Sequence, residues 1–206
     1  MKKLPFLLIF LFLFSSSCSQ EDSYFQRVLN ADSESENWLL HGRTYDESRF
    51  SPLKDINDSN VQDLGLAWSF ETGTNRGHET TPIVVDGMMF ISAPWSLVFA
   101  LDPKTGEKIW SFDPQADKAW ARNACCDVVN RGVAVWEDQV IFATIDGRLI
   151  SLNKDSGEVN WDVLTIDKSK PYTITGAPRI IDGKIIIGNG GGEYGVRGYI
   201  LSLIHI

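Results

Sequence analysis

Short apolar runs separated by turn residues dominate the chain after residue 20. The runs are rich in β-branched or aromatic side chains and lie at 83–85, 88–91, 133–136, 140–143, 148–152, 179–181 and 184–187. Between them stand the pairs Asp86-Gly87, Asp146-Gly147 and Asp182-Gly183. Such pairs favour tight hairpin turns because both residue types tolerate positive φ angles. No stretch after residue 20 keeps a helical period. The pattern therefore predicts an all-β protein.

An internal repeat predicts how the strands are arranged. Residues 100–110 (ALDPKTGEKIW) recur as residues 151–161 (SLNKDSGEVNW). Each copy indicates a strand, a turn closed by glycine and a strand that carries tryptophan. The shared positions are Gly106 and Gly157 in the turns and Trp110 and Trp161 in the strands, with Trp68 preceding the series. Four-stranded units of about 40–50 residues with such fixed positions are typical of β-propeller blades. We interpret the three tryptophans as packing residues between blades.

The first residues have the pattern of an export signal, which we place at 1–19. Lys2 and Lys3 precede an apolar run at 5–14, and small serines follow at 15–17. The run is too short to cross a bilayer as a helix. Two alternatives remain open: a secretory signal cleaved near Ser17 or Ser19, or a lipoprotein signal in which Cys18 is lipidated and anchors the protein to the membrane. Either predicts a periplasmic protein. Residues 20–37 are polar and acidic, and we interpret them as an N-terminal arm.

Composition and charge exclude some classes of protein. The 206 residues are 43% hydrophobic, enough for a packed core, and the net charge is −8. Nucleic acid is not expected as a partner, because phosphate binding needs clustered lysine and arginine. Export gives the adjacent Cys125 and Cys126 an oxidising environment, in which disulfides persist. The remaining cysteine lies in the signal, so we predict a vicinal Cys125–Cys126 disulfide, with two free thiols as the alternative.

Three segments are similar to those of a known family: 76–82 (RGHETTP), 124–132 (ACCDVVNRG) and 190–199 (GGGEYGVRGY). With the tryptophan repeat, they resemble the N-terminal part of the dehydrogenases for alcohols and methanol that depend on pyrroloquinoline quinone (PQQ). Segment 94–100 (PWSLVFA) is more similar to the quinohaemoprotein-like alcohol dehydrogenases. The resemblance implies an eight-bladed quinoprotein-type β-propeller with tryptophan-docking motifs, of which residues 38–200 form about the first three blades.

The resemblance also implies a cofactor site. In the family the vicinal disulfide, here Cys125–Cys126, lies against one face of the PQQ ring. An arginine at the position of Arg131 hydrogen-bonds the cofactor, and arginine suits this role because its donors stay charged. Glu79 and Thr175 match residues that contact its polar groups. Two simpler interpretations stay open: Glu79 as a solvated turn residue and Arg131 as part of a surface ion pair.

The glycine-rich segment is the proposed metal side of that site. Gly190, Gly191 and Gly192 lack Cβ atoms, which lets their backbone approach a ligand closely. Glu193 matches the family's Ca²⁺-binding glutamate, and a carboxylate suits this hard cation. A phosphate-binding loop is rejected because neither a Gly-Lys-Ser/Thr sequence nor a helix pattern follows. The resemblance assigns no catalytic residue within this chain.

The function implied is periplasmic oxidation of primary or other small alcohols to aldehydes with PQQ and Ca²⁺, the electrons passing to a cytochrome c. A lanthanide in place of Ca²⁺ and a haem c in a C-terminal part are compatible with it. A non-catalytic propeller lipoprotein that scaffolds outer-membrane assembly is the alternative, but it would not need Cys125, Cys126, Arg131 or Glu193. A PQQ-dependent sugar or polyol dehydrogenase is another.

The last residues depart from the repeat. After residue 200 the pattern calls for another turn closed by glycine, but the chain reads LSLIHI at 201–206. We interpret this tail as a truncation artefact. Three blades cannot close a ring and leave strand edges unpaired, so we expect the polypeptide alone to be poorly stable and inactive.

Overall fold

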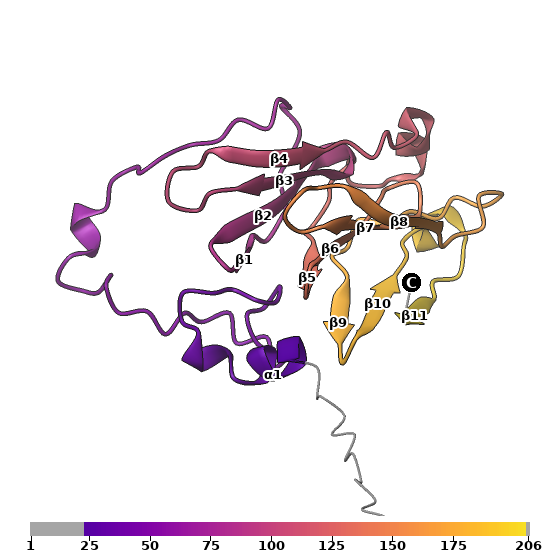
Figure 1. Ribbon diagram of the computed structural model, residues 1–206. Helices are drawn as coiled ribbons and strands as arrows, with labels where there is room; N and C mark the ends of the chain where they lie inside the picture. The colour runs from indigo at the N-terminus through magenta and orange to yellow at the C-terminus, as the bar shows by residue number, and fades with distance from the viewer. Residues whose placement is uncertain (1–22, 205–206) are drawn as a thin grey trace, which may run out of the picture.

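The computed structural model describes residues 23–204, so the export signal and Cys18 lie outside the described residues. Three antiparallel sheets follow one helix, α1 (Ser23–Leu29), and a long irregular segment (Figure 1). Within residues 23–204 no helix is long and apolar enough to cross a membrane. The 3₁₀ turns are η1 (Ala31–Ser33), η2 (Val61–Asp63), η3 (Pro94–Ser96), η4 (Lys118–Asn123) and η5 (Gly192–Tyr194).

Each sheet pairs strands that are neighbours in the sequence. The first contains β1 (Ile83–Val85), β2 (Met88–Ala93), β3 (Leu97–Leu101) and β4 (Lys108–Phe112). The second contains β5 (Ala134–Trp136), β6 (Gln139–Ala143), β7 (Arg148–Asn153) and β8 (Val159–Leu164). The third contains β9 (Arg179–Ile181), β10 (Lys184–Gly188) and β11 (Ile200–Ile204). The prediction of an all-β, partial propeller is confirmed. Residues 201–204 continue β11, which pairs with β10; that the tail is an artefact stays a prediction.

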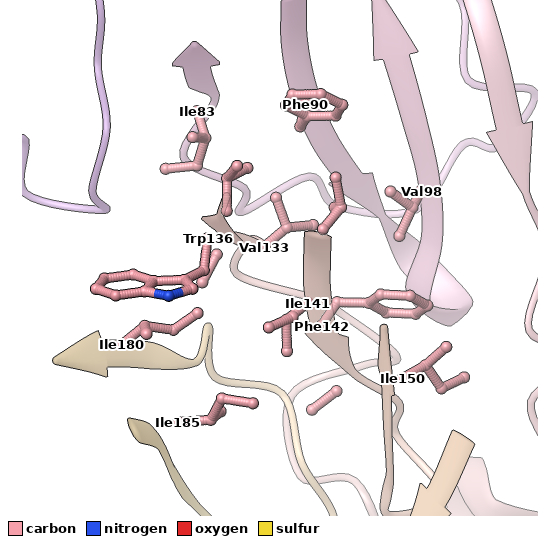
Figure 2. Packing of buried hydrophobic residues seen from close by; sticks show 14 of the residues in the cluster. Ile83, Phe90, Val98, Val133, Trp136, Ile141, Phe142, Ile150, Ile180 and Ile185 are labelled. Carbon is pink, nitrogen blue, oxygen red and sulfur yellow. The ribbon is translucent and has the colours of Figure 1, made fainter. Parts of the chain in front are cut away.

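Burial distinguishes the inner from the outer strands. All of β5 is buried, whereas β4 and β8 are largely exposed. Strand β1 is buried at both ends and β5 throughout, so these two strands lie inside the molecule, and β5 contacts β9 of the next sheet. Figure 2 shows Ile83, Phe142 and Ile180, one from each sheet, pointing into a common apolar cluster. The core thus lies between the blades as well as within them.

Tryptophan packs against glycine at the interface between successive sheets. Trp110 of β4 covers Gly157 in the β7–β8 turn, and its Nε1 donates to Lys154 O at 2.9 Å. A Cβ built on Gly157 would lie 2.8 Å from Trp110 Cδ2. Trp68 repeats this arrangement on Gly106 of the first sheet and donates to Pro103 O at 3.1 Å. The predicted packing between blades is confirmed for Trp110, whereas Trp68 packs on the first sheet from the irregular segment before β1. Trp161 instead donates to Gln139 within its own sheet.

The turns that carry these glycines are built alike. Asp102 Oδ1 accepts from Lys104 N at 2.7 Å, and Asp102 O accepts from Gly106 N at 2.8 Å. Asn153 makes the same contacts one repeat later. The Asp-Gly turns are less uniform. Both residues have positive φ in Asp86-Gly87 and Asp182-Gly183, but only the glycine does in Asp146-Gly147, so the predicted geometry fails for Asp146.

Helix α1 corrects the expectation that no helical segment follows the signal. Tyr24 and Val28, four residues apart, are 3% and 2% exposed, and the Tyr24 ring contacts Trp136 of β5 at 5.2 Å between centroids. The helix has only seven residues, about two turns, which is too short to give a sustained helical period in the sequence. Arg27 pairs with Glu34 and with Asp86 in the β1–β2 turn, each at 2.7 Å. Arg27 holds the pKa of both carboxyl groups below their ordinary values. The arm is therefore fastened to the first two blades.

The docking of Trp110 predicts a specific loss of stability when Gly157 is replaced. Gly157 and Gly183 have similar positive φ angles, +73° and +68°, but a methyl group on Gly183 would meet open space. We expect Gly183→Ala to lower the free energy of unfolding by about 1 kcal/mol through backbone strain. Gly157→Ala should cost about 1–3 kcal/mol more, because Trp110 must move. Urea denaturation of both variants tests this, and equal losses would contradict the docking role.

Candidate functional site

A cleft brings together most of the residues that the sequence assigned to a site. Its volume is about 430 Å³, open mouth included. It is lined by Ala124, Cys125, Cys126, Asp127, Val129, Arg131, Thr173, Thr175, Gly190 and Glu193. Glu79 joins this set through an ion pair with Arg131. Gly191 and Gly192 do not line the cleft, although they connect Gly190 to Glu193. The predicted site therefore forms from loops of all three sheets.

The propeller repeat explains why three of these residues meet. Each of the three lies shortly before the first strand of a sheet: Glu79 before β1, Arg131 before β5 and Thr175 before β9. Backbone hydrogen bonds join these segments side by side: Thr81 N donates to Arg131 O at 3.3 Å, and Arg131 N donates to Thr175 O at 3.0 Å. Equivalent positions in successive blades thus become neighbours at one end of the sheets.

The Arg131 side chain connects the two neighbouring blades. Its Nη2 lies 2.8 Å from Glu79 Oε2, and its Nη1 donates to Thr175 Oγ1 at 2.6 Å. Both side chains of the ion pair are 41% exposed. Glu79 is therefore not merely a solvated turn residue. The planar guanidinium is held in a fixed orientation at the wall of the cleft, where it can bind an anionic or carbonyl group.

Asn130 holds the backbone next to Arg131, and the sequence pattern did not predict this role. Its side chain is 1% exposed, its Nδ2 donates to Ala143 O at 2.8 Å, and its Oδ1 accepts from Gly132 N at 3.1 Å. Ser92 Oγ donates to Asn130 O at 3.3 Å. These bonds fix the backbone on both sides of Arg131. A single asparagine beside a proposed site gives no pattern from which this burial could be predicted.

Cys125 and Cys126 also line the cleft. Both are exposed free thiols in the structure, with their sulfur atoms 2.6 Å apart. The hydrogen bond with Cys126, and after it one with Glu193, raises the pKa of the Cys125 thiol to about 11. The two sulfur atoms therefore already lie next to each other on the surface, and the vicinal disulfide stays a prediction.

The glycine-rich loop places Glu193 beside the sulfur pair. Gly190 N donates to Thr173 O at 2.7 Å, which ties the loop to the segment before β9. Gly191 has φ +114°, and a Cβ there would lie 2.6 Å from Pro171 O, so glycine is required. The pKa of Glu193 is lowered by hydrogen bonding, first from its own backbone N–H and then from the Cys125 thiol. In residues 23–204 no group of three or more acidic, histidine or cysteine side chains could hold a metal ion, so Glu193 offers one ligand only.

Comparison with known proteins places this arrangement in a family. The model of the PQQ family, described as the glucose/ethanol/alcohol dehydrogenase β-propeller domain, matches residues 38–194. This chain belongs to that family. It is 54% identical over 177 residues to the quinohemoprotein alcohol dehydrogenase ADH-IIG of Pseudomonas putida, covering 85% of this chain and 25% of that protein. It is 52% identical over 166 residues to the 1-butanol dehydrogenase (cytochrome c) of Thauera butanivorans, covering 80% of this chain and 24% of that protein.

Solved structures of the PQQ family agree with the fold. The quinohemoprotein alcohol dehydrogenase ADHIIG from Pseudomonas putida HK5 superposes with a TM-score of 0.84 at 53% identity, over 86% of this chain and 26% of that one. A europium-containing methanol dehydrogenase superposes with a TM-score of 0.81 at 37% identity, over 86% and 31%. The chain thus spans about a quarter of the length of the curated relatives that it matches.

The buried amide of Asn130 predicts a measurable cost of substitution. Asn130→Asp keeps the acceptor for Gly132 N but removes the donor to Ala143 O and buries a carboxylate. We expect the free energy of unfolding to fall by about 2–4 kcal/mol at neutral pH. Asn30→Asp is the matched control, because the exposed Asn30 Nδ2 also donates to a backbone carbonyl, Gln26 O at 2.9 Å. Chemical denaturation measures both variants, and a similar small loss in each would show that Asn130 does not carry this support.

Proposed function

We propose that the complete protein containing this chain oxidises small alcohols to aldehydes with PQQ and Ca²⁺ and passes the electrons to a cytochrome c. The observation that carries the proposal is the single cleft lined both by Arg131, held by Glu79 and Thr175, and by the sulfur pair of Cys125 and Cys126. The names of the similar proteins support both substrate and acceptor, since they include alcohol dehydrogenases and a 1-butanol dehydrogenase (cytochrome c).

The residues of the cleft fit the chemistry of PQQ, a flat o-quinone with three carboxylates. Such a group needs a flat surface, a cationic donor and closely approaching backbone. The sulfur pair, Arg131 and Gly190 offer these, and all of them line one cleft. Thr175 adds a hydroxyl beside the guanidinium. Glu193 adds a hard oxygen ligand suited to Ca²⁺. Glu193 alone is not a complete cation site, so it would supply only part of the coordination shell.

Each residue then has a defined task. When bound, PQQ supplies a two-electron acceptor, and a cation beside it supplies Lewis acidity. Arg131 would bind an oxygen of the cofactor and so orient the cofactor. Glu79 and Thr175 would hold the guanidinium in place for this contact. Cys125 and Cys126 would cover one ring face and exclude water from it. Glu193 would hold the cation, and a lanthanide is an alternative because a europium-containing enzyme shares this fold.

Export belongs to the same proposal. A signal at 1–19 would deliver the protein to the periplasm, and lipidation of Cys18 would anchor it to the membrane. An oxidising compartment would also favour the disulfide between Cys125 and Cys126.

The decisive experiment is reconstitution of the complete apo-protein. Dye reduction with ethanol or 1-butanol should appear only when PQQ and either Ca²⁺ or La³⁺ are added, and glucose should be a poor substrate. Arg131→Lys should weaken PQQ binding about tenfold, because the bidentate, oriented donor is lost. Arg49→Lys is the control, since Arg49 pairs with Glu47 outside the cleft. Absence of PQQ binding, or equal effects of the two substitutions, would contradict the proposal.

The disulfide has its own test. Protein recovered from the periplasm is alkylated without reduction, digested and analysed by mass spectrometry. We expect the peptide with Cys125 and Cys126 to lack alkyl groups and to be lighter by two hydrogen atoms than its reduced form, because the sulfur atoms are already adjacent. Complete alkylation of both residues in the exported protein would show that free thiols form this wall.

A further inference from the structure

Three loops converge on the turn that carries the two cysteines. Asp127 follows Cys126 directly, and its carboxylate forms an ion pair with Arg76 from the segment before β1. Arg76 is 50% exposed and Asp127 36% exposed. Neither residue belongs to the Arg131–Glu79 pair, so a second arginine–carboxylate contact joins the first and second blades beside the cleft.

Trp95 supports the same turn from the side. Its backbone N donates to Val128 O at 2.9 Å. The Arg76 guanidinium carbon lies 5.7 Å from the centre of the Trp95 ring, and Lys118 Nζ lies 4.0 Å from it. The ring packs on an apolar cluster that contains Val128 and Ile145. Arg76 therefore contacts both the tryptophan and the aspartate of the turn.

The backbone of this region is strained. Trp95, Ser96 and Asp127 have φ angles of 66°, 62° and 72°, a conformation that side chains with a Cβ rarely adopt. Such residues persist only where surrounding contacts impose them, and they gather at functional sites. Here the contacts are the Arg76–Asp127 pair, the Trp95–Val128 hydrogen bond, and a bond from Ile145 N to Ser96 Oγ at 3.2 Å.

We propose that Arg76, Asp127 and Trp95 are positioning residues that hold the Cys125–Cys126 turn in place as a wall of the cofactor cleft. They act through the backbone of the turn rather than by contact of their charges with the cofactor. The inference rests on the proposed function only in that the wall serves PQQ. That the ion pair orders the turn is independent of any ligand.

Charge alone makes the opposite prediction, so the two explanations can be separated. PQQ carries three carboxylates. A purely electrostatic role would make Arg76→Gln weaken its binding and Asp127→Asn strengthen it. A positioning role makes both substitutions weaken binding, because each removes the same ion pair. It also makes the double variant no weaker than the worse single variant, since contacting residues are not additive.

The test uses the complete protein with these three variants and Asp182→Asn as the matched control. Asp182 also has positive φ, 49°, and pairs with an exposed Lys184 at 2.9 Å, but it lies in the β9–β10 turn away from the cysteines. PQQ affinity of the apo-protein is measured by titration. Hydrogen exchange is measured at the amides of Trp95 and Ala124, which donate to Val128 O and Ala121 O. Exchange in β6 reports whether the variants remain folded.

We expect Arg76→Gln and Asp127→Asn each to weaken PQQ binding by about fivefold, the scale of a half-exposed ion pair, and to accelerate exchange at Trp95 and Ala124. Asp182→Asn should change neither. Opposite effects of the two single variants on affinity, or exchange unchanged from the control, would overturn the proposal. If the unmodified protein does not bind PQQ, the proposed function fails, and the exchange rates alone decide whether the pair orders the turn.

Discussion

The packing of tryptophan on a bare glycine backbone is the constraint on which the rest of the structure depends. Trp110 on Gly157 joins the first sheet to the second, and Trp68 packs in the same way on Gly106 from the segment before the first sheet. Each indole donates to an equivalent carbonyl, Lys154 O for Trp110 and Pro103 O for Trp68. A ring can lie this close only because the glycine has no Cβ and accepts the positive φ of its turn. The other contacts between sheets, including those at the cleft, depend on this distance.

The fixed spacing between sheets brings residues at equivalent positions of the repeat together in the cleft. The segments before β1, β5 and β9 occupy the same place in their blades, and the rungs from Thr81 N to Arg131 O and from Arg131 N to Thr175 O join them in a row. Side chains at these positions therefore meet across blades although they are far apart in the sequence. One polar residue in each of the segments before β1, β5 and β9 is therefore enough to bring three polar side chains together. The loops at 124–128 and 190–193 supply the other residues that line the cleft.

The sequence predicted what depends on local pattern and missed what depends on distant contacts. Alternating apolar runs and Asp-Gly pairs located most strands to within two residues, and the glycine–tryptophan repeat predicted the docking of Trp110. Six of the residues assigned by the resemblance line one cleft, namely Cys125, Cys126, Arg131, Thr175, Gly190 and Glu193, whereas Gly191 and Gly192 do not line it. Helix α1 and the buried amide of Asn130 were missed, because each depends on partners that are distant in the sequence, such as Trp136 for Tyr24 and Ala143 for Asn130. The strained turn at Trp95 was missed for the same reason.

The charges of the cleft support the proposal that a cofactor and a cation bind there together. Glu79 and Asp127 are each paired with an arginine, whereas Glu193 receives hydrogen bonds from backbone N–H groups and from Cys125. These five ionised groups leave the cleft slightly negative before any ligand arrives. Like charges disfavour one another in a partly desolvated site, so a ligand with three carboxylates needs a compensating positive charge. A cation on Glu193 would supply it, and the two arginine pairs would keep Glu79 and Asp127 from competing for that cation.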